Sequence, residues 1–69
     1  MKGPVLTLLR DMCEGGFAVT LYRRDNLWHI YMKRLAYSDA PFRNVQAATM
    51  LGAVRKAHDV TLDWINEER

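Results

Sequence analysis

The 69-residue sequence contains one cysteine and no long apolar run. Cys13 cannot form an internal disulfide, which excludes the disulfide-rich secreted scaffolds and indicates a reducing, cytoplasmic location. The apolar stretch near the N-terminus is interrupted by Arg10 and Asp11, so it is too short for a membrane span or for the core of a signal peptide. We therefore expect a cytoplasmic protein that does not act at a membrane.

Charge of one sign is not in large excess, because ten Lys and Arg residues accompany eight Asp and Glu residues. The resulting net charge of +2 is small for a dedicated polyanion-binding domain. Hydrophobic residues make up 49% of the chain, as in folded globular proteins. A chain of this length can form only one small core, so we expect residues 1–69 to be a single domain.

Motifs for catalysis and metal binding are absent from the sequence. Gly15-Gly16 lacks the Lys-Ser/Thr pair of a phosphate-binding loop, and no Cys or His residues occur at zinc-ligand spacing. His58 and Asp59 are neighbours on a predicted helix, where adjacent side chains point about 100° apart and seldom hydrogen-bond each other. We therefore expect no catalytic residues, no cofactor and no metal, and we predict that the protein is not an enzyme.

The first predicted element is a helix over residues 4–14. Pro4 suits the first turn of a helix, and Gly15-Gly16 ends it. Met12 and Cys13 are both expected to fill the core, because buried Met and Cys behave as adaptable hydrophobic residues. Apolar residues at helical spacing predict the buried face, which consists of Val5, Leu8, Leu9 and Met12.

Residues 17–24 and 27–34 alternate between apolar and polar side chains and predict two antiparallel strands. Asp25-Asn26 fits a two-residue loop, because both residue types tolerate positive φ, and it pairs Arg24 with Leu27. In that register, the apolar side chains share one face of the hairpin: Phe17, Val19, Leu21, Trp28, Ile30 and Met32. The outer face carries Thr20, Tyr22, Arg24, His29, Tyr31 and Lys33.

A long helix is predicted over residues 40–58. Ser38-Asp39-Ala40-Pro41 predicts its start, because Ser or Asp can accept hydrogen bonds from free N–H groups and proline suits the first turn. Small and apolar residues then give the helix a broad apolar face, and we expect it to end near His58.

Residues 59–66 fit two patterns. Val60, Leu62 and Trp64 alternate with polar residues as in a strand, so a third strand near residues 60–65 is one interpretation. Leu62 and Ile65 also continue the helical apolar stripe, so a second helix or a helical extension is the other. The sequence does not decide between them.

Together these elements predict an α+β fold, in which a small antiparallel β-hairpin, with or without a third strand, is packed on one face by an N-terminal helix and a longer C-terminal helix. The order of elements resembles that of small docking domains between subunits of nonribosomal peptide synthetases, of several phage-encoded inhibitors and of small nucleic-acid-binding modules. No motif carries this resemblance, so it concerns element order alone.

The outer face of the hairpin is the candidate binding surface, because aromatic rings lie among cationic side chains there. Arg34 is expected at the strand end, and Arg43 is expected in the first turn of the long helix near the basic end of the hairpin. Ordinary cross-strand pairing could also explain these residue types. The predicted contact residues are Tyr22, Arg24, His29, Tyr31, Lys33, Arg34 and Arg43.

Two kinds of partner fit this surface. Tyr, Trp, Met and Arg are enriched at protein interfaces, and an acidic C-terminal segment would oppose a polyanion. We therefore expect a small non-catalytic adaptor, docking module or inhibitor, of the kind that phages and mobile elements encode, that binds a larger protein through its hairpin. The alternative is a nucleic-acid-binding regulator using the same face. A homodimer formed through free strand edges, or through the surfaces of Trp28 and Trp64, is compatible with either function.

Overall fold

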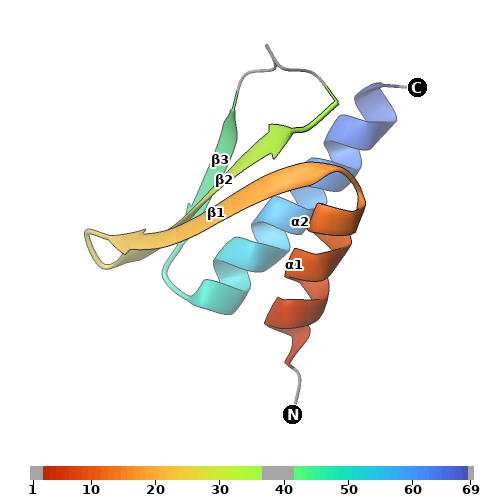
Figure 1. Ribbon diagram of the computed structural model, residues 1–69. Coiled ribbons are helices and arrows are strands. Elements are labelled where there is room, and N and C mark those ends of the chain that lie inside the picture. The colour runs from red at the N-terminus through yellow and green to blue at the C-terminus, as the bar shows by residue number, and fades with distance from the viewer. Residues whose placement is uncertain (1–2, 37–41, 69) are drawn as a thin grey trace.

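The computed structural model describes residues 3–36 and 42–68. These residues form two helices that cover one face of a three-stranded antiparallel sheet of order β1-β2-β3 and leave the other face uncovered (Figure 1). The predicted α+β fold is therefore confirmed. The elements are α1 (Pro4–Glu14), β1 (Phe17–Arg24), β2 (Leu27–Arg34), β3 (Arg43–Ala47) and α2 (Met50–Glu67).

Helix α1 has the predicted bounds. It begins at Pro4 and ends where Gly15 donates its N–H to the carbonyl of Asp11 at 2.9 Å. Met12 is 2% exposed and belongs to the core, whereas Cys13 is exposed, so the prediction that Cys13 fills the core is wrong. The reason is geometric, since consecutive helical residues point about 100° apart and only Met12 faces the sheet.

The hairpin has the predicted register at every position of β1. Arg24 pairs with Leu27, and the pairing continues without a bulge to Phe17 and Arg34. Asp25 and Asn26 have φ values of 55° and 64°, which are the left-handed angles that a type I′ turn requires at both central positions. Turn chemistry and alternation thus fixed the same register independently.

Strand β3 was not predicted. Residues 43–47 were assigned to the long helix, but they form a strand whose Val45 pairs with Ile30 of β2. The free edge of β2 offers main-chain hydrogen-bond partners to this segment, and the segment also alternates, so tertiary pairing outweighs its helical apolar pattern. The third strand is therefore at residues 43–47 and not at 60–65. The predicted helix start at Ser38 to Pro41 lies outside the described residues.

Helix α2 begins seven residues after the start of β3 and continues beyond the predicted end. Its N-terminal cap is Thr49, whose Oγ1 accepts a hydrogen bond from the N–H of Gly52 at 3.0 Å. A Cβ atom at Gly52 would lie 2.8 Å from that oxygen, so glycine leaves room for the cap. Residues 59–66 continue the helix, because Thr61 and Trp64 extend the buried stripe that begins at Ala53.

The core lies between the helices and the covered face of the sheet. Ala53 and Ala57 are fully buried, and their small side chains let α2 lie close to the strands. In the described parts of the chain, neither helix is both long enough and apolar enough to cross a bilayer. The buried apolar residues are Met12, Phe17, Ile30, Met32, Ala53, Val54, Ala57 and Trp64.

Candidate functional site

The uncovered face of the sheet carries a row of rings that extends from β1 across β2 to the residue before β3. Tyr22 comes from β1, His29 and Tyr31 come from β2, and Phe42 immediately precedes β3. We call Tyr22, His29, Tyr31 and Phe42 the aromatic row. Strand alternation places these side chains opposite the core, so the same register that buries Ile30 presents the row.

The rings of the aromatic row contact one another in sequence. Tyr22 and His29 are direct cross-strand partners, and their ring centroids lie 5.0 Å apart with the planes inclined by only 8°. The Tyr22 and Tyr31 centroids are 5.6 Å apart, and those of Tyr31 and Phe42 are 6.0 Å apart. These separations are typical of attractive aromatic pairs, so the rings support each other's orientation.

A hydrogen bond further restrains the row, and the surroundings of Tyr22 shift its pKa. The Nε2 atom of His29 lies 3.2 Å from the carbonyl oxygen of Arg24, so this nitrogen carries the proton and donates it. A hydrogen bond with the Tyr31 side chain, followed by desolvation, raises the pKa of Tyr22 above its ordinary value. The His29 ring is therefore held in place, and Tyr22 stays uncharged at neutral pH.

Much of the row is accessible to a partner. Phe42 is 66% exposed and Tyr31 is 39% exposed, and Leu35, which follows β2, is 62% exposed. These three are among the most exposed large apolar side chains of the described residues. Clustered exposed rings of this kind mark interaction surfaces more often than isolated ones do.

Two cations border the row. Lys33 places its Nζ atom 5.6 Å from the centroid of Phe42. Arg24 lies next to the turn, where its Nε is 3.8 Å from the Asp25 carboxylate and both side chains are more than 70% exposed (74% and 83%). Solvent weakens such a pair, so Arg24 remains available to another anion. The strands contain no Asp or Glu residue.

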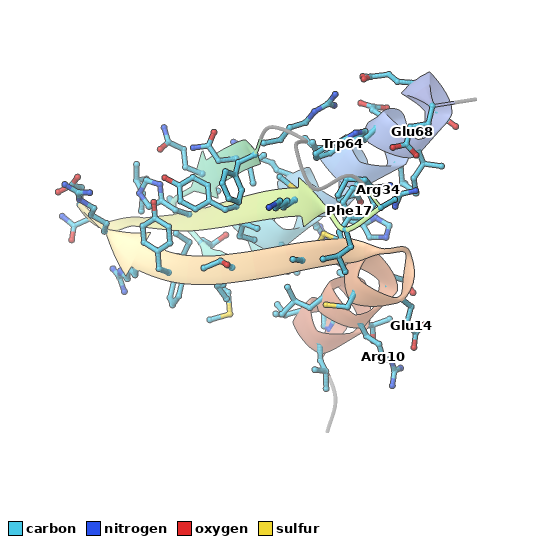
Figure 2. All side chains as sticks on the ribbon, turned by 45° about the horizontal axis from the view of Figure 1, so that its top comes forward. Arg10, Glu14, Phe17, Arg34, Trp64 and Glu68 are labelled. Carbon is cyan, nitrogen blue, oxygen red and sulfur yellow. The ribbon has the colours of Figure 1, made fainter. Side chains whose placement is uncertain are left out.

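Arg34 lies on the other face of the sheet. Its guanidinium group donates two hydrogen bonds to Glu68, at 2.9 and 3.2 Å, and one to the carbonyl of Gly15. It also lies over the ring of Phe17, 4.6 Å from the centroid. Figure 2 shows Arg34, Phe17, Trp64 and Glu68 gathered where β2 meets the C-terminal end of α2.

Arg43 makes a similar set of contacts beside it. Its guanidinium carbon lies 4.2 Å from the ring centroid of Trp64, and its nitrogens donate to Glu67 at 2.8 and 3.4 Å. The Arg43 hydrogen bond lowers the pKa of Glu67 and, in turn, raises the pKa of Arg43. Trp64 meets Phe17 edge to face at 5.3 Å, which joins the two groups. We call this cluster the latch: Arg34, Phe17, Trp64, Arg43, Glu67 and Glu68.

The structure therefore brings together five of the seven predicted contact residues and separates the other two. Arg34 and Arg43 stabilise the contact between the sheet and α2 and do not border the aromatic row. Phe42, Asn44 and Gln46 were missed as members of the outer face, because residues 40–58 were expected to be helical. The alternation of Arg43, Val45 and Ala47 with polar residues was the available signal, although it is short. The five predicted contact residues that share the outer face are Tyr22, Arg24, His29, Tyr31 and Lys33.

A groove of about 460 Å³ lies between the helices, on the side away from the row. His58 lines it, and the Nε2 atom of His58 is 3.4 Å from the Asp11 carboxylate, so its partner is Asp11 of α1 and not the adjacent Asp59. Among residues 3–36 and 42–68, no group of three or more His, Cys, Asp and Glu side chains is placed to hold a metal ion. The remaining groove residues are Pro4, Thr7, Leu8, Arg55 and Asp59.

No family model, no curated protein and no solved structure matches the chain.

Proposed function

We propose that this chain is a small, non-catalytic intracellular protein that binds a larger protein through the uncovered face of its sheet. The aromatic row carries the proposal, because its rings are pre-oriented by mutual contacts and remain exposed at Tyr31 and Phe42. Rigid, exposed aromatic side chains lose little conformational entropy on binding and are enriched among the residues that dominate interface energies.

The charged side chains beside the aromatic row indicate the kind of partner. Arg24 and Lys33 are the cations beside the row, and the strands carry no carboxylate. A matching protein surface would present an apolar patch bordered by Asp or Glu side chains. An adaptor, docking module or inhibitor would act in this way. The exposed, unpaired thiol of Cys13 supports an intracellular location, where thiols stay reduced.

The first experiment tests where a partner binds. A photo-crosslinking amino acid replaces Phe42 in one variant and Leu62 in a control variant, since Leu62 of α2 is also exposed, at 48%. We expect a discrete crosslinked protein from cells of the native host only with the probe at position 42. Crosslinks of equal yield at both positions would contradict the proposal.

The second experiment measures affinity for the partner so obtained. The double variant Tyr22→Ala/Tyr31→Ala should weaken binding about tenfold or more, because two anchoring rings are lost. Its stability should fall by only about 1 kcal/mol, the value of cross-strand pairs. The control Leu6→Ala/Leu62→Ala removes two exposed apolar side chains from the helices and should leave affinity unchanged. Unchanged binding by the folded tyrosine variant would refute the proposal.

A second candidate, a nucleic-acid-binding regulator, is favoured by one further observation. Glu67 and Glu68, which were expected to oppose a polyanion, are paired with Arg43 and Arg34 on the covered face. In this second function, bases would stack on the aromatic row and phosphates would lie near Lys33. Titration of mixed-sequence single-stranded oligonucleotides at several salt concentrations tests it. Binding by this route should weaken steeply with salt, and Lys33→Gln should reduce the slope by about one.

A further inference from the structure

The two outer strands of the sheet differ in how their edges are protected. β3 is only five residues long, and Arg43 at its start points its side chain toward the helices. The main-chain carbonyl of Gln46 accepts a hydrogen bond from Lys56 Nζ at 3.1 Å. A short strand, an inward charge and a covering cation are three ways in which proteins prevent an edge strand from pairing with another chain.

The edge of β1 lacks the short length and the covering cation, and its one charge on the helix side, Arg23 over the Trp28 ring, lies next to the turn. β1 is eight residues long, contains no proline and pairs with β2 without a bulge. Its first charged residue is Arg23, so residues 17–22 form an uncharged stretch. An uncharged, regular edge strand is a template for pairing with another strand. Figure 2 shows β1 as the outer strand on the side of the sheet away from β3.

The register shows which main-chain groups of β1 face outward. A type I′ turn closes with a hydrogen-bonded pair, here Arg24 and Leu27, and hydrogen-bonded pairs then recur at every second position. The N–H of Leu35 donates to the carbonyl of Gly16 at 2.9 Å, which confirms the same alternation at the far end. Val19, Leu21 and Arg23 therefore direct their N–H and C=O groups away from β2. No other residue within the described ranges hydrogen-bonds to these groups.

We propose that β1 pairs in antiparallel orientation with β1 of a second copy of this chain, which joins both sheets into one. Charge allows two identical β1 strands to pair in this orientation. Arg23 and Arg24 both lie at the C-terminal end of β1, so a twofold axis places them at opposite ends of the joint, whereas a parallel arrangement would place like charges side by side. Closed twofold pairing is also the commonest form of self-association.

The alternation of side chains fits a joint centred on Leu21. Leu21 then meets Leu21 of the second copy, and Val19 lies opposite Arg23. Val19 and Leu21 are only half-buried in one copy, so the added strand covers apolar surface on the helix side. In this register, paired side chains of the two copies point to the same face, so both aromatic rows lie on the same face of the joined sheet.

Amide hydrogen exchange on the full chain, measured by NMR from micromolar to millimolar protein, tests the pairing. Light scattering on the same samples reports the mass. We expect the amides of Val19, Leu21 and Arg23 to become protected in step with a doubling of mass. The outward-facing amides of Asn44 and Gln46 on β3 are internal controls and should exchange at the same rate throughout. A monomer at every concentration, or a dimer whose β1 amides stay unprotected, would overturn the proposal.

A matched pair of variants sharpens the test. Val19→Pro removes one outward N–H and leaves the hydrogen bonds between β1 and β2 intact, as proline at a sheet edge does. Val19→Ala shortens the same side chain but keeps the N–H. We expect Val19→Pro to weaken the dimer about tenfold or more, because two hydrogen bonds are lost per dimer, and Val19→Ala to weaken it much less. Equal effects would overturn the assignment of the joint to β1.

The test does not depend on the folding of the Val19→Pro variant. Exchange is measured on the unmodified chain, so the proposal is tested whether or not the Val19→Pro variant folds, which circular dichroism reports. Protection of the β1 amides that appears only with a host protein bound, in a chain that is otherwise monomeric, would assign the edge to that partner and overturn pairing with a second copy.

Discussion

The two faces of the sheet use aromatic rings and cations in opposite ways. In the latch, the guanidinium of Arg43 lies 4.2 Å from the centroid of Trp64 and is hydrogen-bonded to Glu67. In the aromatic row, rings contact one another, and Lys33 approaches Phe42 at 5.6 Å with no carboxylate on the strands. Cations whose donors are already paired inside the fold offer little to a partner. Residue type alone therefore does not distinguish a binding face from a structural contact.

The largest expected effect is on the latch. Trp64 is 7% exposed and links Phe17 to Arg43, so Trp64→Ala removes a ring contact, a stacked cation and core volume. We expect a loss of about 3–5 kcal/mol in the free energy of unfolding, measured by urea denaturation followed by circular dichroism. A chain of this size has little more stability than that, so the variant should be only marginally folded.

The matched change in the aromatic row is Phe42→Ala. Phe42 is 66% exposed and contacts Tyr31 and Lys33 only on the surface, so the free energy of unfolding should change by no more than about 0.5 kcal/mol. Similar losses for Trp64→Ala and Phe42→Ala would remove the distinction between the two faces.

A smaller effect is expected for the ion pair between Arg34 and Glu68, whose side chains are 16% and 23% exposed. Arg34→Met leaves the Gly15 carbonyl and the Glu68 carboxylate without this donor and should cost about 1–3 kcal/mol. A double-mutant cycle with Glu68→Gln measures the coupling between the two side chains. Both stability and coupling are read from urea midpoints.

The control cycle uses Arg24→Gln and Asp25→Asn at the exposed turn. That pair is separated by 3.8 Å and is largely solvated, so its coupling should be below about 0.5 kcal/mol. If the exposed pair couples as strongly as Arg34 and Glu68, burial does not explain the strength of the latch.

The smallest effect is a pH dependence at the end of the latch. Arg43 lowers the pKa of Glu67 in the folded chain, so the unfolded chain binds this proton first as pH falls. The stabilisation by Glu67 is complete above its unfolded pKa, whose ordinary value is 4.5, and disappears as pH falls through the lower folded pKa. Urea midpoints should fall less steeply on acidification for Glu67→Gln than for the unmodified chain. High salt should reduce the difference between the two slopes. Identical slopes at low salt would contradict the prediction.

Local signals were sufficient for the first half of the fold. The bounds of α1 and the complete register of the hairpin were predicted, because Pro4, Gly15-Gly16 and Asp25-Asn26 restrict the backbone at the ends of strongly periodic segments. Once that register was known, Tyr22, His29 and Tyr31 were correctly placed on one face. Backbone restrictions and strict alternation act within a few residues, so one sequence reveals them.

Non-local effects explain the errors in the second half. Val45 and Ala47 fit a helical stripe as well as a strand, and only the free edge of β2 selects the strand. Because residues 43–47 form a strand, α2 begins only at Met50. Residues 59–66 continue this helix. Phe42 and Arg43 are adjacent at the start of β3, so their side chains point to opposite faces of the sheet. The location of Phe42 on the outer face and of Arg43 in the latch therefore depends on this segment being a strand.

The sequence by itself determined a small α+β fold, the hairpin register and most of the aromatic row, because these follow from periodicity and turn chemistry. Tertiary structure decided which cations remain available. Arg34 and Arg43 are as basic as Arg24 in the sequence, yet they are paired with Glu68 and Glu67, which lie more than twenty residues away along the chain. Pairing over such distances requires the packed fold, because only packing of α2 on the sheet brings these charges together.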